Sequence, residues 1–155
     1  MQLNVLAAAV AVALPVHGTV VPGASLGGLR LGDSQQGVVA VWGRKFAVCR
    51  GCPRVTWYYN YAAYEPQGAA VEFQAGRVVA LYTLWSPPGW RTPQGLRTGD
   101  PASHVTSVYG PLTRLGCGTY DAYQLPGRSS LTNFYVYGEK VWGFGLSRRS
   151  LPVCR

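Results

Sequence analysis

Apolar residues at helical spacing mark one short segment in the first half of the chain. Val38, Val41 and Trp42 fall on a single face of an α-helix. Asp33, a residue type favoured at helix starts, precedes this face, and Gly43, typical of helix ends, follows it. The pattern predicts a short amphipathic helix with Asp33 as its N-cap.

The second half of the chain carries a similar pattern. Val105, Val108 and Tyr109 fall on one helical face, between a capping residue, Asp100, and a terminating glycine, Gly110. The pattern predicts a second short helix. Because capping accounts for both aspartates, we expect neither of them to act in catalysis.

Each expected helix is followed by three segments with the composition of β-strands, rich in β-branched and aromatic residues. Short turns that contain glycine separate the second and third segment of each group. The expected strands span residues 55–61, 69–73 and 77–84 after the first helix, and residues 119–125, 131–137 and 140–147 after the second.

The helical segments belong to a repeat. Residues 28–43 recur 67 positions later as residues 95–110, and eight of the sixteen paired positions are identical. Self-similarity at a fixed spacing is typical of a duplicated structural unit. We therefore expect an α+β fold of two tandem units packed together, each a helix plus a three-stranded antiparallel sheet, with the helices on one face of the sheet. The expected organisation is a signal peptide or apolar leader over residues 1–25, a first unit over 26–84, a Pro/Trp linker over 85–94 and a second unit over 95–155.

The leader is an apolar run from Val5 to Val16, and no charged residue precedes Arg30. A run of this length suits the hydrophobic region of a signal peptide and is too short to span a bilayer. Cleavage after Gly18 or after Ser25 would fit the preference for small residues, and an apolar N-terminal strand or tail is the alternative. The sequence predicts a secreted or extracytoplasmic protein without a membrane span.

Four cysteines follow the leader, and in a small exported protein an even number predicts disulfides. Of the three pairings, the places of the cysteines in the two units favour Cys49 with Cys52 and Cys117 with Cys154. A redox-active pair is disfavoured because Cys49 follows a helix end, and a zinc site because no second closely spaced pair occurs. We expect no metal ion and no cofactor.

The phrase Gly-Leu-Arg-x-Gly-Asp opens both copies of the repeat and leads into a helix ending in Trp-Gly or Tyr-Gly, then aromatic strands and a hairpin. Over about residues 25–148 the chain thereby resembles the superfamily of the β-lactamase inhibitory proteins and the outer-membrane-assembly lipoproteins of the SmpA/OmlA type. The resemblance implies the tandem architecture and a non-catalytic, protein-binding function. A lipid anchor is not expected, because no cysteine precedes Cys49. The Arg-rich, Lys-poor composition is similar to that of secreted proteins of high-GC bacteria.

The chain is basic, with 14 Lys and Arg against 6 Asp and Glu and a net charge of +8. Such a balance suits an anionic partner. The basic residues are spread singly, except for the adjacent pairs Arg44–Lys45 and Arg148–Arg149, and we expect no nucleic-acid partner. An alternative function is therefore binding of an anionic cell-wall polymer or glycan through Arg50, Arg54 and Arg77 together with the rows of aromatic residues.

Residues that would indicate an enzyme are few. His104 lies on the second expected helix, and the chain has neither a Gly-rich phosphate loop after a strand nor a His-Glu-x-x-His motif. A hydrolase that uses His104 is the least favoured hypothesis, and we expect no catalytic site.

Aromatic residues are numerous, with ten Tyr and five Trp, and those of residues 55–61 alternate along the expected strand. Tyr, Trp and Arg are the residues that dominate binding hot spots. We therefore expect a secreted, non-enzymatic protein-binding or inhibitory module that uses an exposed aromatic and arginine face of its sheet. The expected contact residues are Tyr58, Tyr64, Tyr123, Arg54 and Arg77.

Overall fold

The computed structural model describes residues 18–59, 68–84 and 89–155. This part of the chain is mostly β-structure, with two helices of eight residues each. In chain order the elements are β1 (Val20–Val21), β2 (Ser25–Leu26), α1 (Gln35–Trp42), β3 (Phe46–Val48), β4 (Val55–Tyr59), β5 (Gly68–Gln74), β6 (Arg77–Leu84), α2 (Ala102–Tyr109), β7 (Thr113–Gly116), β8 (Asp121–Pro126), β9 (Ser130–Tyr137) and β10 (Lys140–Arg148).

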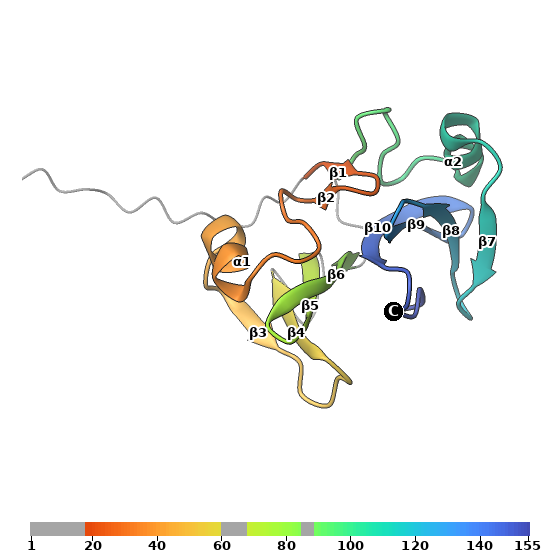
Figure 1. The fold of residues 1–155 in the computed structure, drawn as a ribbon. Coiled ribbons are helices and arrows are strands. Elements are labelled where there is room, and N and C mark those ends of the chain that lie inside the picture. Colours follow the sequence, from red (N-terminus) through yellow and green to blue (C-terminus); the bar gives the residue numbers. More distant parts are fainter. Residues whose placement is uncertain (1–17, 60–67, 85–88) are drawn as a thin grey trace, which may run out of the picture.

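Eight of these strands form one antiparallel sheet in the order β3-β4-β5-β6-β10-β9-β8-β7 (Figure 1). At its centre β6 pairs with β10, and Leu81 lies opposite Leu146. The strands β1 and β2 form a separate two-stranded hairpin. The two halves of the sheet are therefore joined by backbone hydrogen bonds and not only by side-chain packing.

The expected α+β fold of two tandem units, each a helix plus a three-stranded sheet, is wrong. The structure is mostly β, and its main sheet is one continuous layer of eight strands. Sequence patterns missed β3 and β7, because these edge strands are short and largely exposed and so show no alternation of apolar and polar residues. They also gave no sign that β6 and β10 pair.

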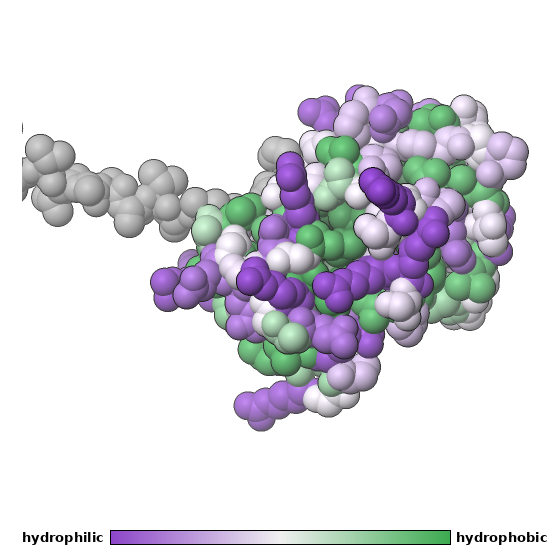
Figure 2. All heavy atoms as spheres, viewed as in Figure 1, coloured by the Kyte–Doolittle hydropathy of each residue, from purple (hydrophilic) through white to green (hydrophobic). Residues whose placement is uncertain are grey.

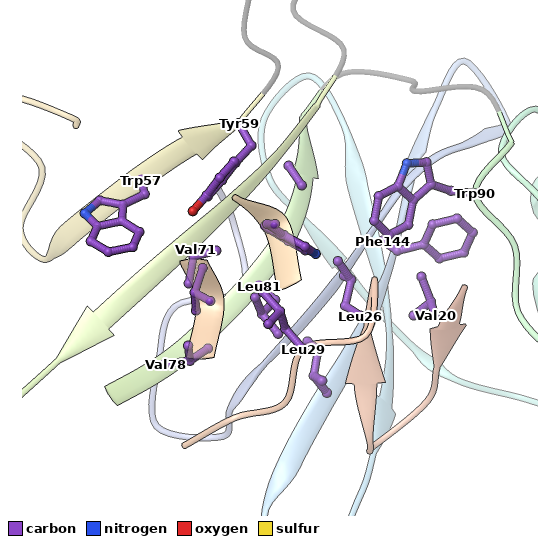
Figure 3. Packing of buried hydrophobic residues seen from close by; sticks show 14 of the residues in the cluster. Val20, Leu26, Leu29, Trp57, Tyr59, Val71, Val78, Leu81, Trp90 and Phe144 are labelled. Atoms are coloured by element: carbon purple, nitrogen blue, oxygen red, sulfur yellow. The ribbon is translucent and has the colours of Figure 1, made fainter. Parts of the chain in front are cut away.

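One face of the sheet carries the main hydrophobic core. Both helices and the β1–β2 hairpin lie on this side (Figure 1), and Val38 of α1 and Val105 of α2 are fully buried in the core. Buried side chains run without a break from Trp57 on β4 to Phe144 on β10 (Figure 3). This continuous core explains why the halves form one body.

The β1–β2 hairpin packs closely into this core. Gly27 follows it with a φ of +59°, and a Cβ there would lie 3.0 Å from both Trp42 and Trp90. The indole N–H of Trp42 donates to the Gly27 carbonyl at 2.8 Å. Trp90, from the expected linker, is 1% exposed, and Val20, from the expected leader, is fully buried. Cleavage after Gly18 would keep this hairpin, whereas cleavage after Ser25 would remove β1.

The expected N-cap role of Asp33 is wrong. Ser34 caps α1, accepting from the Gly37 N–H at 3.0 Å. Asp33 instead accepts from the backbone N–H of Arg30 at 2.8 Å, and its carbonyl accepts from the N–H of Val78 at the start of β6. Through Asp33 the repeated motif therefore connects the loop before α1 to the β5–β6 hairpin by hydrogen bonds.

The second copy of the motif makes the same contacts. Asp100 accepts from the N–H of Arg97 at 2.8 Å, and its carbonyl accepts from the N–H of Val141 on β10. Pro101, and not Asp100, occupies the cap position of α2. Both aspartates therefore have a structural role, different from the one expected.

Candidate binding site

The face of the sheet opposite the helices carries a hollow lined by aromatic rings. On the central strands small and aromatic residues alternate across the register, with Tyr58 opposite Ala70, Ala70 opposite Tyr82, and Tyr82 opposite Gly145. Cross-strand neighbours of this kind share a face of the sheet. The rings enclose a cavity of about 260 Å³. We call it the aromatic pocket; its lining is Tyr58, Tyr82, Thr83, Tyr120, Tyr135, Trp142 and Arg155.

Two glycines of β10 leave room for this arrangement. A Cβ at Gly145 would lie 2.8 Å from the hydroxyl of Tyr135, and one at Gly143 would lie 2.5 Å from the hydroxyl of Thr83. That hydroxyl accepts from the backbone N–H of Phe144 at 2.9 Å. A larger residue at either glycine would displace the wall of the pocket.

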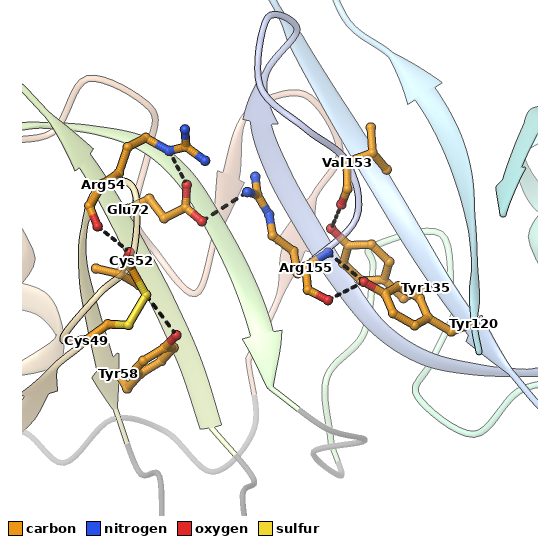
Figure 4. A network of polar contacts seen from close by, with 10 residues as sticks. Cys49, Cys52, Arg54, Tyr58, Glu72, Tyr120, Tyr135, Val153 and Arg155 are labelled. Carbon is orange, nitrogen blue, oxygen red and sulfur yellow. Dashed lines mark hydrogen bonds and ion pairs between the residues drawn. A yellow bond between two sulfur atoms is a disulfide. The ribbon is translucent and has the colours of Figure 1, made fainter. Parts of the chain in front are cut away.

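The last residues of the sequence, 149–155, form a C-terminal segment that returns across this face (Figure 4). The hydroxyl of Tyr135 donates to the carbonyl of Val153 at 2.8 Å. The hydroxyl of Tyr120 forms hydrogen bonds with the backbone N–H and carbonyl of Arg155. These contacts place the Arg155 side chain in the wall of the pocket.

Glu72 on β5 is the carboxylate that balances this arginine. Its side chain is 7% exposed and accepts from Nε of Arg54 at 2.7 Å and from Nη1 of Arg155 at 3.0 Å (Figure 4). The guanidinium of Arg155 also lies over the ring of Tyr82, 5.1 Å from its centroid. Its Nε is buried without a hydrogen-bond partner among the described residues. Two guanidinium groups therefore share one carboxylate at this edge of the pocket.

Two tyrosines of the pocket, Tyr82 and Tyr135, are neutral phenols. Burial raises the pKa of Tyr135 above its ordinary value. Burial also raises the pKa of Tyr82, and the nearby carboxylate of Glu72 adds to this effect. At physiological pH the pocket therefore presents rings and hydroxyl groups, with Arg155 as its charged member.

The structure brings together only part of the expected contact set. Tyr58 lines the pocket. Arg54 is connected to it indirectly, because it pairs with Glu72, which also pairs with the lining residue Arg155. Tyr123 packs against the core on the opposite face, where Arg114 donates to its hydroxyl at 3.0 Å. Arg77 is exposed at the start of β6, and Tyr64 lies outside the described residues.

Sequence reasoning missed Tyr82, Tyr120, Tyr135, Trp142 and Arg155. Alternation within β6 and β9 could have placed Tyr82 and Tyr135 on one face, because every second residue of a strand faces the same side. Arg155 had no such signal, since a disulfide and tertiary hydrogen bonds bring it to the pocket.

The cysteine pairing expected from the sequence is confirmed. Cys49 is bonded to Cys52, and Cys117 to Cys154, and no cysteine is left free among the described residues. The hydroxyl of Tyr58 lies 3.7 Å from the sulfur of Cys52 (Figure 4). One disulfide thus borders the pocket, and the other holds the C-terminal segment that forms its wall.

The remaining candidate groups lie apart from the pocket. Nδ1 of His104 lies 2.8 Å from a carboxylate oxygen of Asp100 on the helix side of the sheet. The hydroxyl of Ser107 donates to the backbone carbonyl of His104 and not to its ring. Within the described ranges no group of three or more His, Cys, Asp or Glu could hold a metal ion, and neither of the short helices could cross a membrane.

No protein-family model matches the chain, and no curated protein matches it. Solved structures with a similar fold include an extracellular protein containing an SCP domain from Bacillus anthracis str. Ames, 14% identical with a TM-score of 0.58, covering 77% of this chain and 44% of that one. A DUF4309 family protein from Bacillus subtilis subsp. subtilis str. 168 is 11% identical with a TM-score of 0.55, covering 76% of this chain and 79% of that one.

At these identities the likeness shows the fold alone. The chain spans less than half the length of the first of these structures. The two disulfides are typical of proteins that fold outside the reducing cytosol.

Proposed function

We propose that this chain is a secreted, non-catalytic module that binds a protein partner through the aromatic pocket. The observation that carries the proposal is the preformed cavity of about 260 Å³, lined by five aromatic side chains and one arginine. Concave, largely apolar sites with a few convergent polar groups are the usual places of recognition. Tyr, Trp and Arg are also the residues that contribute most to protein–protein hot spots.

The pocket fits one large side chain rather than a wide flat surface. Tyr82 and Tyr135 are 7% and 3% exposed, so the rings form a recess and not the open aromatic face expected from the sequence. The aromatic rings and the guanidinium of Arg155 in the lining together favour an apolar or aromatic side chain that is followed by an acidic residue. We therefore expect the partner to insert such a pair from an exposed loop.

Further aromatic contacts continue outward from the pocket. The ring centroids of Tyr120 and Trp142 are 5.3 Å apart, and those of Trp142 and Tyr137 are 6.4 Å apart. Tyr137 is 59% exposed. A partner anchored in the pocket would cover these rings, which extends the interface beyond a single side chain.

Secretion and an inhibitor-like role belong to the same proposal. The apolar leader, the two disulfides and the extracellular structural neighbour support export. The resemblance of the repeated motif to the β-lactamase inhibitory protein superfamily supports binding without catalysis.

Capture experiments with matched variants test the proposal. Wild-type protein that lacks residues 1–17, and so keeps the β1–β2 hairpin, is immobilised and exposed to culture medium and to solubilised cell envelope, beside Trp142→Ala and Tyr123→Ala. Trp142 lines the pocket, whereas Tyr123 is a half-buried aromatic residue of the opposite face. We expect a protein that is captured by the wild type and by Tyr123→Ala but lost with Trp142→Ala.

The affinity of the purified partner then decides the matter. We expect Trp142→Ala to weaken binding by about 30-fold, the effect of removing a hot-spot side chain, and Tyr123→Ala by less than about threefold. Circular dichroism and urea midpoints confirm that both variants are folded. Equal capture by all three proteins, or no specific capture by the wild type, would refute the proposal.

A further inference from the structure

A second concave surface lies at the other end of the central strands. Three segments far apart in the sequence meet there: Leu31 and Gly32 before α1, Ser129 in the β8–β9 turn, and residues 148–150 at the end of β10 and just after it. They enclose a groove of about 460 Å³, which we call the arginine groove because Arg148 and Arg149 line it. The aromatic pocket instead involves Tyr82 and Thr83 near the end of β6, so the two sites are distinct.

Positive charge collects around this groove. Arg148 and Arg149 are exposed, and the guanidinium of Arg77 reaches the carbonyl of Gly32 at 3.5 Å. Arg30 and Arg128 are also exposed and directly adjoin lining residues in the sequence. Figure 2 shows hydrophilic side chains gathered over the middle of one face, where Figure 1 places β6 and β10.

These charges are not neutralised by ion pairs within the described part of the chain, where the five ion pairs involve only Arg54, His104, Arg114 and Arg155 as cations. The acidic residue nearest in sequence to the groove is Asp33, whose Oδ2 already accepts from the backbone N–H of Arg30. The groove thus presents several guanidinium groups with little compensating charge.

We propose that the arginine groove binds a linear polymer that carries repeated phosphate groups. The planar guanidinium matches two phosphate oxygens at once, which gives both geometry and strength to the contact. Arg148 and Arg149 in the groove, with Arg30, Arg77 and Arg128 on neighbouring segments, can contact successive phosphates of one chain. A groove also accommodates a chain better than a flat surface. This site is independent of the protein-binding function proposed above, and of the Arg50, Arg54 and Arg77 set expected from the sequence it includes only Arg77.

Charge reversal with a matched control tests the proposal. The chain without residues 1–17, which keeps the β1–β2 hairpin, is titrated with linear inorganic polyphosphate by calorimetry, as the wild type, as Arg148→Glu/Arg149→Glu and as Arg44→Glu/Lys45→Glu. Arg44 and Lys45 are the other adjacent basic pair, are exposed and lie at the end of α1. Both double variants change the net charge by the same amount, so only the location differs.

We expect the groove variant to lose about tenfold or more in affinity, and to show a weaker dependence of affinity on salt, because fewer phosphates are neutralised. The control should lose less than about threefold. Equal losses in the two variants would show an effect of net charge alone and overturn the proposal. Phosphatidylglycerol vesicles are titrated in parallel, and binding to the vesicles without binding to polyphosphate would also overturn it. Capture of the protein partner should be unchanged by the groove variant, which separates this test from that of the aromatic pocket.

Discussion

Glu72 shows how one residue organises the aromatic face. Its carboxylate is almost fully buried and is paired with two guanidinium groups. One belongs to Arg54, directly before β4, and the other to Arg155 in the C-terminal segment. A buried carboxylate is tolerated only when it is paired and hydrogen-bonded. The same pairs hold the arginine that gives the aromatic pocket its charge.

Removal of this carboxylate charge tests its role. We expect Glu72→Gln to lower the free energy of unfolding by about 2–4 kcal/mol, because two largely buried guanidinium groups lose their counter-charge. Urea denaturation followed by fluorescence measures the change. Glu139→Gln is the control, since the side chain of Glu139 is 75% exposed, and its effect should stay below about 0.5 kcal/mol. Similar losses in the two variants would contradict the role given to Glu72.

At the scale of elements, two tight hairpins define the strands that form the centre of the sheet. Ala75 and Gly76 join β5 to β6 with φ values of +50° and +71°, and Gly138 and Glu139 join β9 to β10 with +56° and +58°. Two successive residues with positive φ are typical of the type I′ turn, which matches the twist of paired strands. Ala75 therefore adopts a conformation that is costly for a residue with a Cβ.

An asparagine at this position should relieve the strain. Asn tolerates positive φ, and Asn-Gly is a favoured type I′ sequence. We expect Ala75→Asn to raise the free energy of unfolding by about 0.5–1 kcal/mol, as measured by the urea midpoint. Gln74→Asn, one residue earlier in the extended strand β5, should give no gain, because Asn is depleted in strands. A gain of equal size at both positions would contradict the explanation by backbone conformation.

At the scale of the whole molecule, the C-terminal segment links the two halves of the sheet. The disulfide between Cys117 and Cys154 holds the segment beside the second half, while Arg155 reaches Glu72 in the first half. The bond closes a loop of 37 residues, whereas the bond between Cys49 and Cys52 closes a loop of three. Chain entropy therefore makes the longer loop the more stabilising one.

Paired serine variants compare the two disulfides. We expect Cys117→Ser/Cys154→Ser to lower the free energy of unfolding by about 4 kcal/mol and Cys49→Ser/Cys52→Ser by about 2 kcal/mol, as the loop-length dependence predicts. Urea denaturation at equal protein concentration measures both. The first variant should also weaken partner binding, because it releases the wall of the aromatic pocket. A larger loss for the short loop would contradict this view of the fold.

The sequence by itself determined the local structure of this protein. Apolar periodicity located both helices, turn residues located both central hairpins, and the places of the cysteines in the repeat indicated their pairing. These signals depend on residues close together in the chain, or on a repeat that is visible without coordinates. The repeated motif was also visible, but the role of its aspartates was not. They do not cap the helices; their side chains accept from the preceding loop backbone, and their carbonyls accept from the following hairpin.

Only the tertiary structure decided how these pieces combine. The pairing of β6 with β10, which makes one eight-stranded sheet, depends on strands that are more than fifty residues apart and leaves no periodic signal. The aromatic pocket likewise collects Tyr58, Tyr135 and Arg155 from three distant segments. The arginine groove does the same with Gly32 and Arg148. Such contacts follow from burial and backbone hydrogen bonding of the whole chain, which local residue preferences do not encode.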